Sequence, residues 1–182
     1  MHEPDDEPDF DESSLGPPDG VLGAATALQA VLVHGSERAV VIDEVVVYPT
    51  GFTFTVIAID TAAATAPHEA DDESGWWPAG DRLGSGSIRE PQCRLRFPNG
   101  TYASPDFMQD DRAHAPTISS LGGSGGDTRS ETEYWVTPLP SPGQLTFEAR
   151  WPDSDEPPGS VSFDADVLLD AVSRTVRVWD DD

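Results

Sequence analysis

The segment RAVVIDEVVVYPTGFTFTVIAID, residues 38–60, decides how this chain folds. It contains two runs of β-branched and aromatic residues, separated by Pro49-Thr50-Gly51. In the second run, alternate positions are apolar and would share one face of a strand: Phe52, Phe54, Val56 and Ala58. A period of two on either side of a Pro/Gly turn predicts an antiparallel strand pair. We expect this pair to form the centre of a β-sheet core.

Later segments repeat the alternation and predict further strands added to the central pair. In the clearest of them, apolar residues alternate with polar ones: Leu145, Phe147, Ala149 and Trp151. Residues 133–139 also give a clear strand signal, and weaker strand signals cover residues 26–34, 93–97 and 161–163. From Ala165 onward, apolar residues recur at helical spacing behind Asp164 and Asp166, either of which can cap a helix: Leu168, Leu169, Val172 and Val176. The predicted fold class is all-β, an antiparallel β-sandwich of roughly seven to nine strands with one short C-terminal helix.

The predicted domain organisation is a single folded body with acidic ends. Residues 1–20 combine acidic residues with prolines, which predicts a disordered acidic arm. A single β-sandwich domain is expected over residues 21–179, because 182 residues are too few for two ordinary domains. Residues 180–182 would form an acidic tail. Residues 103–131 are rich in glycine, serine and proline, and we expect mostly loop there, with one short extended piece at Thr117–Leu121.

The net charge of the chain limits the classes of partner that it is expected to bind. The chain has 34 acidic and 10 basic residues, a net charge of −24. Such a surface repels phosphate backbones and anionic lipid, so we expect neither nucleic-acid nor membrane binding. It attracts cationic proteins, and we therefore expect a protein partner, with a basic one favoured. Two alternatives stay open, since the charge can also serve solubility alone and the chain can self-associate into a homo-oligomer.

Composition also excludes several kinds of chemistry. All ten basic residues are arginine, so neither a Schiff-base lysine nor a P-loop lysine is present. Cys93 is the only cysteine, which excludes an internal disulfide and fits a reducing compartment. The start of the chain, MHEPDDEPDF, lacks the basic and apolar regions of a signal peptide, and no apolar run is long enough to span a membrane. We expect a cytoplasmic protein.

The long interruption at residues 61–87 holds the residues that we predict to contact a partner. Such a long segment between strands is usually functional or disordered. It places two adjacent tryptophans beside a group of carboxylates: Trp76, Trp77, Asp71, Asp72 and Glu73. Two neighbouring residues of a strand cannot both face inward, so one indole is expected to remain exposed as an anchor. The alternative is that both rings cover the edge of the core.

Motifs for chemistry are weak, and we predict no catalytic, metal or cofactor site. The tract GGSGG, residues 122–126, matches the G-x-S-x-G pattern formally. A nucleophile elbow needs a helix after the serine, however, and the residues that follow lead into a strand, so a flexible loop is predicted instead. The acidic clusters lack the spacing of a calcium loop. A hydrolase with an unrecognised carboxylate or histidine site is the alternative to a binding protein.

Four segments together resemble a known group of proteins: VVVYPTGFTFTV, RFPNG, GGSGG and YWVTPLPSPGQLTFEARWP, the last followed by a short helix. The combination resembles a group of small, acidic, uncharacterised actinobacterial proteins with a β-sandwich body. The resemblance covers residues 21–179. It implies the sandwich fold and implies no activity, cofactor or catalytic residue. The favoured function is therefore that of a non-enzymatic binding or accessory protein.

Overall fold

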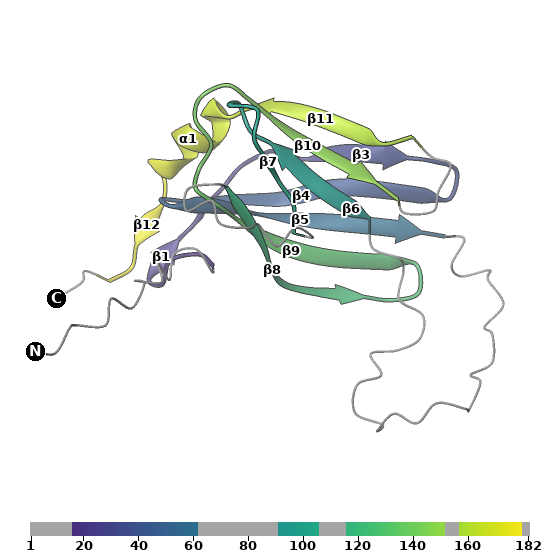
Figure 1. The fold of residues 1–182 in the computed structure, drawn as a ribbon. Helices are drawn as coiled ribbons and strands as arrows, with labels where there is room; N and C mark the ends of the chain where they lie inside the picture. The colour runs from purple at the N-terminus through teal and green to yellow at the C-terminus, as the bar shows by residue number, and fades with distance from the viewer. Residues whose placement is uncertain (1–15, 62–90, 106–115, 152–156, 180–182) are drawn as a thin grey trace, which may run out of the picture.

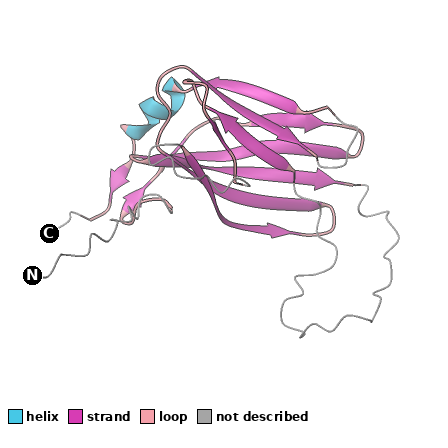
Figure 2. Ribbon diagram, in the orientation of Figure 1, coloured by secondary structure: helices cyan, strands magenta, loops and turns pink. Residues whose placement is uncertain are grey.

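The computed structural model describes residues 16–61, 91–105, 116–151 and 157–179 of the chain. These residues form strands in three sheets and one short helix (Figures 1 and 2). The elements are β1 (Val21–Leu22), β2 (Ala24–Ala25), β3 (Ala30–His34), β4 (Arg38–Tyr48), β5 (Gly51–Asp60), β6 (Gln92–Arg96), β7 (Tyr102–Ala103), β8 (Thr117–Gly125), β9 (Arg129–Thr137), β10 (Gln144–Arg150), β11 (Gly159–Asp164), α1 (Asp166–Val172) and β12 (Val176–Arg177). No helix in these ranges is long and apolar enough to cross a membrane.

Every strand pairing is antiparallel, as expected for an all-β sandwich. The larger sheet has the order β2-β4-β5-β9-β8, and β3 also pairs with β4. The smaller sheet has the order β11-β10-β6-β7, and a two-stranded ribbon joins β1 to β12. Figure 1 shows the smaller sheet lying across the larger one, with α1 at one end. The predicted fold class is confirmed.

The central pair forms as predicted and supplies the middle of the larger sheet. β4 and β5 are joined by a tight turn, with Tyr48 opposite Gly51 and Arg38 opposite Asp60. Gly51 is required there, because a Cβ at this position would overlap the carbonyl of Val136 on β9. The four alternating apolar residues of β5 are all buried on one face: Phe52, Phe54, Val56 and Ala58.

Aromatic rings from both sheets interlock in the core. The Phe54 ring lies 5.2 Å from that of Phe147 on β10, in an edge-to-face arrangement. Phe54 also stacks on Tyr134 of β9, at 5.4 Å, and Phe147 meets Phe163 of β11 at 5.8 Å. Offset and edge-to-face pairs add about 0.5–1.5 kcal/mol each beyond the area that they bury. The alternating residues of β10 predicted to face inward are buried.

Three boundaries differ from the prediction. The strand expected over residues 26–34 is shorter, because β3 begins only at Ala30, and a separate short strand, β2, precedes the expected range. The tract Gly122–Gly125, expected as loop, is the second half of β8 and pairs with β9. Val176, expected on the helix, lies in β12, because α1 ends at Val172. Ser and Thr hydroxyls end the helix by donating to its last carbonyls, as Thr175 Oγ1 does to Val172 O at 2.9 Å.

The sandwich has one closed side and one open side. On the closed side β11 packs directly against β3, and a Cβ at Gly159 would overlap the Leu32 carbonyl. On the open side β8 is the last strand of the larger sheet, and its residues from Ser120 to Gly125 are all exposed. We call this segment, residues 120–125, the open edge.

Candidate functional site

An irregularity in β4 shapes the most distinctive surface of the described residues. The pairing of β4 with β5 shifts register between Asp43 and Val46, which makes a β-bulge. Within it, Glu44 has a positive φ of 50°, a conformation that is uncommon for residues other than glycine. The Asp43 carboxylate holds the bulge, because its Oδ1 accepts the Glu44 N–H at 2.8 Å and the Gln29 side-chain amide at 2.9 Å. Bulges commonly re-aim side chains at functional positions.

A groove of about 600 Å³ opens beside the bulge. Its walls come from the segment between β2 and β3, from the bulge and from one residue of β9. The lining residues are Ala25, Thr26, Ala27, Leu28, Gln29, Asp43, Glu44, Val45, Val46 and Glu133. The groove thus combines short apolar side chains with three carboxylates. We call it the acidic groove.

The sheet register explains why its carboxylates gather. Asp43 on β4 lies opposite Thr55 on β5, and Thr55 lies opposite Glu133 on β9. The three residues therefore form one row across the face of the larger sheet that points away from the core. Thr55 is buried between the two acids, while Glu133 is exposed. Within the described part of the chain, no ion pair forms at Glu133.

The negative charge of Glu133 affects the pKa of the neighbouring Tyr48 side chain. Burial raises the pKa of Tyr48 above its ordinary value of 10.0, and the negative charge of Glu133 raises it further. Both causes disfavour the tyrosinate anion. The Tyr48 ring packs edge-to-face on Trp135, at 5.7 Å between centroids. Glu133 therefore acts on its surroundings as an uncompensated charge.

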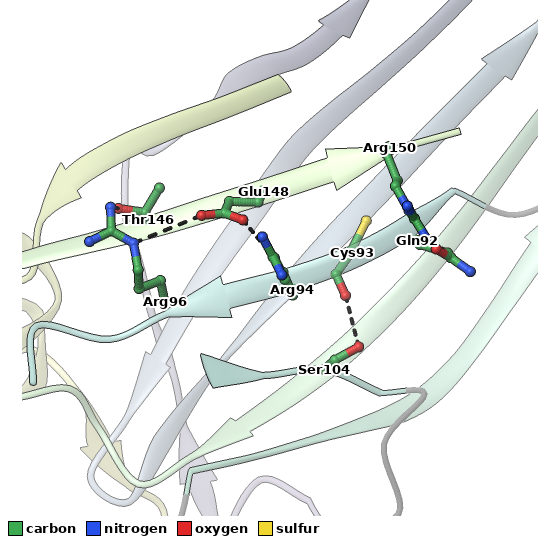
Figure 3. A network of polar contacts seen from close by, with 8 residues as sticks. All are labelled: Gln92, Cys93, Arg94, Arg96, Ser104, Thr146, Glu148 and Arg150. Atoms are coloured by element: carbon green, nitrogen blue, oxygen red, sulfur yellow. Dashed lines mark hydrogen bonds and ion pairs between the residues drawn. The ribbon is translucent and has the colours of Figure 1, made fainter. Parts of the chain in front are cut away.

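The outer face of the smaller sheet has the opposite character (Figure 3). Three arginines project from it, and their partners are uncharged or shared: Arg94 and Arg96 on β6, and Arg150 on β10. Glu148 accepts Arg94 Nε at 2.6 Å and lies 3.8 Å from Arg96 Nε, so one carboxylate serves two guanidinium groups. We call this surface the arginine face.

The remaining polar contacts hold these arginines against the sheet. Arg150 Nε donates to Gln92 at 2.7 Å, and Arg96 donates to Thr146 at 3.1 Å. The Arg94 guanidinium lies 4.8 Å from the centre of the Tyr102 ring. Exposed pairs of this kind contribute about 0–1 kcal/mol each. The arginine face therefore binds its own strands together. In the described structure the groove carboxylates form no ion pair, and the guanidinium of Arg174 contacts the groove wall only through the Ala25 carbonyl, at 3.3 Å.

The predicted partner contacts lie outside the described residues, so the structure does not place them: Trp76, Trp77, Asp71, Asp72 and Glu73. The G-x-S-x-G match falls within β8 and leads into β9, so Ser124 lies on a strand rather than at an elbow. Cys93 is buried, as its alternation predicted, and His34 is exposed at the end of β3. Neither residue lines the acidic groove.

Metal binding finds no support in the part of the chain that the structure covers. No group of three or more His, Cys, Asp and Glu residues there could hold a metal ion. Although Asp43, Glu44 and Glu133 share a groove, they do not converge as ligands.

Comparison with known proteins adds no further assignment: no family model, curated protein or solved structure matches the chain. The resemblance to the actinobacterial group stays a prediction. The groove itself was not predicted from the sequence. The signal for it is the pair Asp43-Glu44, which interrupts the apolar alternation of β4 and marks the bulge.

Proposed function

We propose that this chain is a non-enzymatic binding protein of the cytoplasm, which holds a basic protein partner through the acidic groove. The observation that supports the proposal best is the lining of the groove, in which the carboxylates of Asp43, Glu44 and Glu133 lie among small apolar side chains. A lysine or arginine side chain has the same two parts, an apolar stem and a cationic head. The groove therefore complements such a side chain in chemistry as well as in charge.

The rest of the molecule supports the same partner. A net charge of −24 accelerates the encounter with a basic protein and repels acidic competitors. The carboxylates of the groove then provide the site at which the attracted partner binds. Glu133 and Glu44 are the residues to test, because the Asp43 side chain also holds the bulge.

A matched pair of double variants separates the groove from net charge. Glu44→Gln with Glu133→Gln removes two charges from the groove, while Glu37→Gln with Asp127→Asn removes two exposed charges from turns elsewhere. The protein and both variants are used for affinity capture from the native host at low and high salt, and the captured protein is then titrated by calorimetry. We expect a basic partner, lost at high salt, whose affinity falls about tenfold or more in the groove variant and less than about threefold in the control.

Two outcomes contradict the proposal. Equal losses in both double variants mean that charge in general, and not the groove, attracts the partner. Captured proteins that are neutral or acidic exclude a basic partner altogether. Turnover of a captured small molecule, lost in the groove variant, favours the alternative of a hydrolase, and a salt-dependent dimer in sedimentation favours self-association.

A further inference from the structure

The open edge differs from every other strand margin in the described structure. β8 has nine residues, TISSLGGSG, with no charge and no proline among them. Natural sheets usually protect an exposed edge with lysine, proline or a very short strand, because unpaired backbone groups pair readily with another chain. β7, at the margin of the smaller sheet, is such a short strand, with two residues. Over its six consecutive exposed residues β8 has no lysine and no proline, and its one irregularity is the register shift between Ser120 and Gly122.

The ladder between β8 and β9 fixes which backbone groups point outward. Gly126 N–H donates to the Arg129 carbonyl at 2.8 Å. Antiparallel partners alternate between bonded and non-bonded pairs, so the N–H groups of Gly123 and Gly125 point away from β9. A register shift lies between Ser120 and Gly122, and beyond it Ser120 resumes the outward phase. In the described part of the chain no strand pairs with β8 on this outer side.

The glycine and serine residues of β8 are too small to cover the neighbouring glutamates of β9, which can therefore be reached from beyond the edge. Gly122 lies opposite Glu133, which forms no ion pair in the described structure, whereas Ser124 lies opposite Glu131, whose carboxylate is paired with Arg129 at 2.6 Å. A strand added to β8 would run two strand spacings, about 10 Å, from β9. That span is within the combined reach of a glutamate and a long cationic side chain, and only a hydrogen atom and a hydroxymethyl group lie between them.

We propose that β8 is a docking edge for an extended basic segment of the partner, which adds as a further antiparallel or parallel strand. Backbone hydrogen bonds to the outward groups of the open edge provide the affinity, and an arginine or lysine opposite Gly122 reaches Glu133. Glu133 also lines the acidic groove, so a second cationic residue of the same partner can occupy that groove. The inference rests on the proposed function and specifies how the basic partner binds.

Charge complementarity selects this occupant over a second copy of the chain. Two copies joined at β8 would bring Glu133 of each protomer, unpaired among the described residues, towards that of the other, and each copy has a net charge of −24. Like charges beside an interface oppose association, whereas a cationic strand neutralises the same acids. The uncharged edge therefore fits a basic segment best.

The test uses the full chain and a nine-residue peptide of alternating arginine and threonine, matched to the length of β8. The control peptide has the same sequence with every backbone nitrogen methylated, which retains the charge and removes the donors. We expect calorimetry to show that methylation weakens binding about tenfold or more, since several backbone hydrogen bonds of about 0.5–1.5 kcal/mol are lost.

Protein variants locate the same contact. Ser120→Pro removes one outward N–H, and Ser120→Ala is its matched control; thermal unfolding verifies that both fold. We expect Ser120→Pro to weaken the unmethylated peptide about fivefold or more and Ser120→Ala less than about twofold. Glu133→Gln should weaken both peptides by a similar factor, because it removes charge and leaves the edge intact.

Each contrary result has a distinct meaning. If the methylated peptide binds as well as the unmethylated one, strand addition is wrong; loss of binding in the Glu44→Gln, Glu133→Gln variant then leaves the proposed function standing. If neither peptide binds, the docking edge is wrong, and the captured partner decides the proposed function separately. A dimer that Ser120→Pro dissociates shows that a second copy occupies the edge, which also overturns the inference.

Discussion

The two sides of the sandwich differ in how the backbone of their edge strands is protected. On the closed side, β11 and β3 come from different sheets and pack so closely that Gly159 has no room for a side chain against Leu32. On the open side, β8 ends the larger sheet with exposed glycine and serine. The closed side protects its backbone by contact, and the open side has no further strand paired with it among the described residues. The difference teaches that edge protection in the described part of this molecule is local, and the unprotected edge at β8 is the basis of the proposed docking edge.

The largest expected effect contrasts a side chain of the closed side with one of the open side. Phe147 is buried and contacts Phe54 and Phe163, whereas Leu121 is 39% exposed. Phe147→Ala should lower the free energy of unfolding by about 3–5 kcal/mol, because it leaves a cavity in the core. Leu121→Ala should change it by no more than about 0.5 kcal/mol. Denaturant titration of both variants measures the contrast, and similar losses would show that the open edge is packed as tightly as the core.

A pair of glycines tests the same contrast in the backbone. Gly159→Ala should lower the free energy of unfolding by about 1–3 kcal/mol, because the new methyl group meets the Leu32 carbonyl and the two strands must separate. Gly126→Ala, at the end of the open edge, has open space around its Cβ and should lie within about 0.5 kcal/mol of the wild type. An unaffected Gly159→Ala variant would mean that β11 and β3 are not in contact.

The smallest expected effect is a shift in the pKa of Tyr48, which reports the charge of Glu133 beside the open edge. Because the pKa of Tyr48 is raised in the folded state, Tyr48 stabilises the fold fully below its unfolded pKa near 10. That contribution is lost as the pH rises through the folded pKa. Glu133→Gln should lower the pKa of Tyr48 only in part, since burial is the larger cause. Absorbance of the tyrosinate, with Tyr48→Phe to assign the signal, measures the shift; an unchanged midpoint would show that Glu133 is screened.

Much of the fold could be predicted because its strands alternate strictly. β5 and β10 have apolar residues at every second position, and those residues are buried as predicted, although β5 buries almost all of its intervening residues as well. The second half of β8 was missed because glycine and serine have low strand propensity, and only pairing with β9 makes them a strand. The helix was overextended because Val176 falls at helical spacing by coincidence. The residues Val176, Arg177 and Val178 also alternate, and tertiary pairing with β1 decides in favour of a strand.

The acidic groove was harder to predict from the sequence than the fold. Its parts come from three separate stretches of the chain: the segment before β3, the bulge in β4 and Glu133 on β9. No local pattern links them, since their proximity depends on the register of β4, β5 and β9. The sequence does indicate the bulge, because Asp43-Glu44 breaks the alternation, but a break in a pattern gives no information about what lies opposite. The predicted contacts Trp76 and Trp77 lie outside the described residues and stay predictions.

The glycines of β8 limit how this molecule can be redesigned. Gly122 has a φ of 152°, which other residues rarely adopt, and a Cβ at Gly123 would lie 2.6 Å from the Glu131 carbonyl. Neither position accepts a lysine or a bulky residue without rebuilding the strand. An engineer who wants to prevent aggregation must therefore work at Ser120, Leu121 or Ser124. The backbone of β8 therefore excludes larger side chains from the middle of the strand, at Gly122 and Gly123.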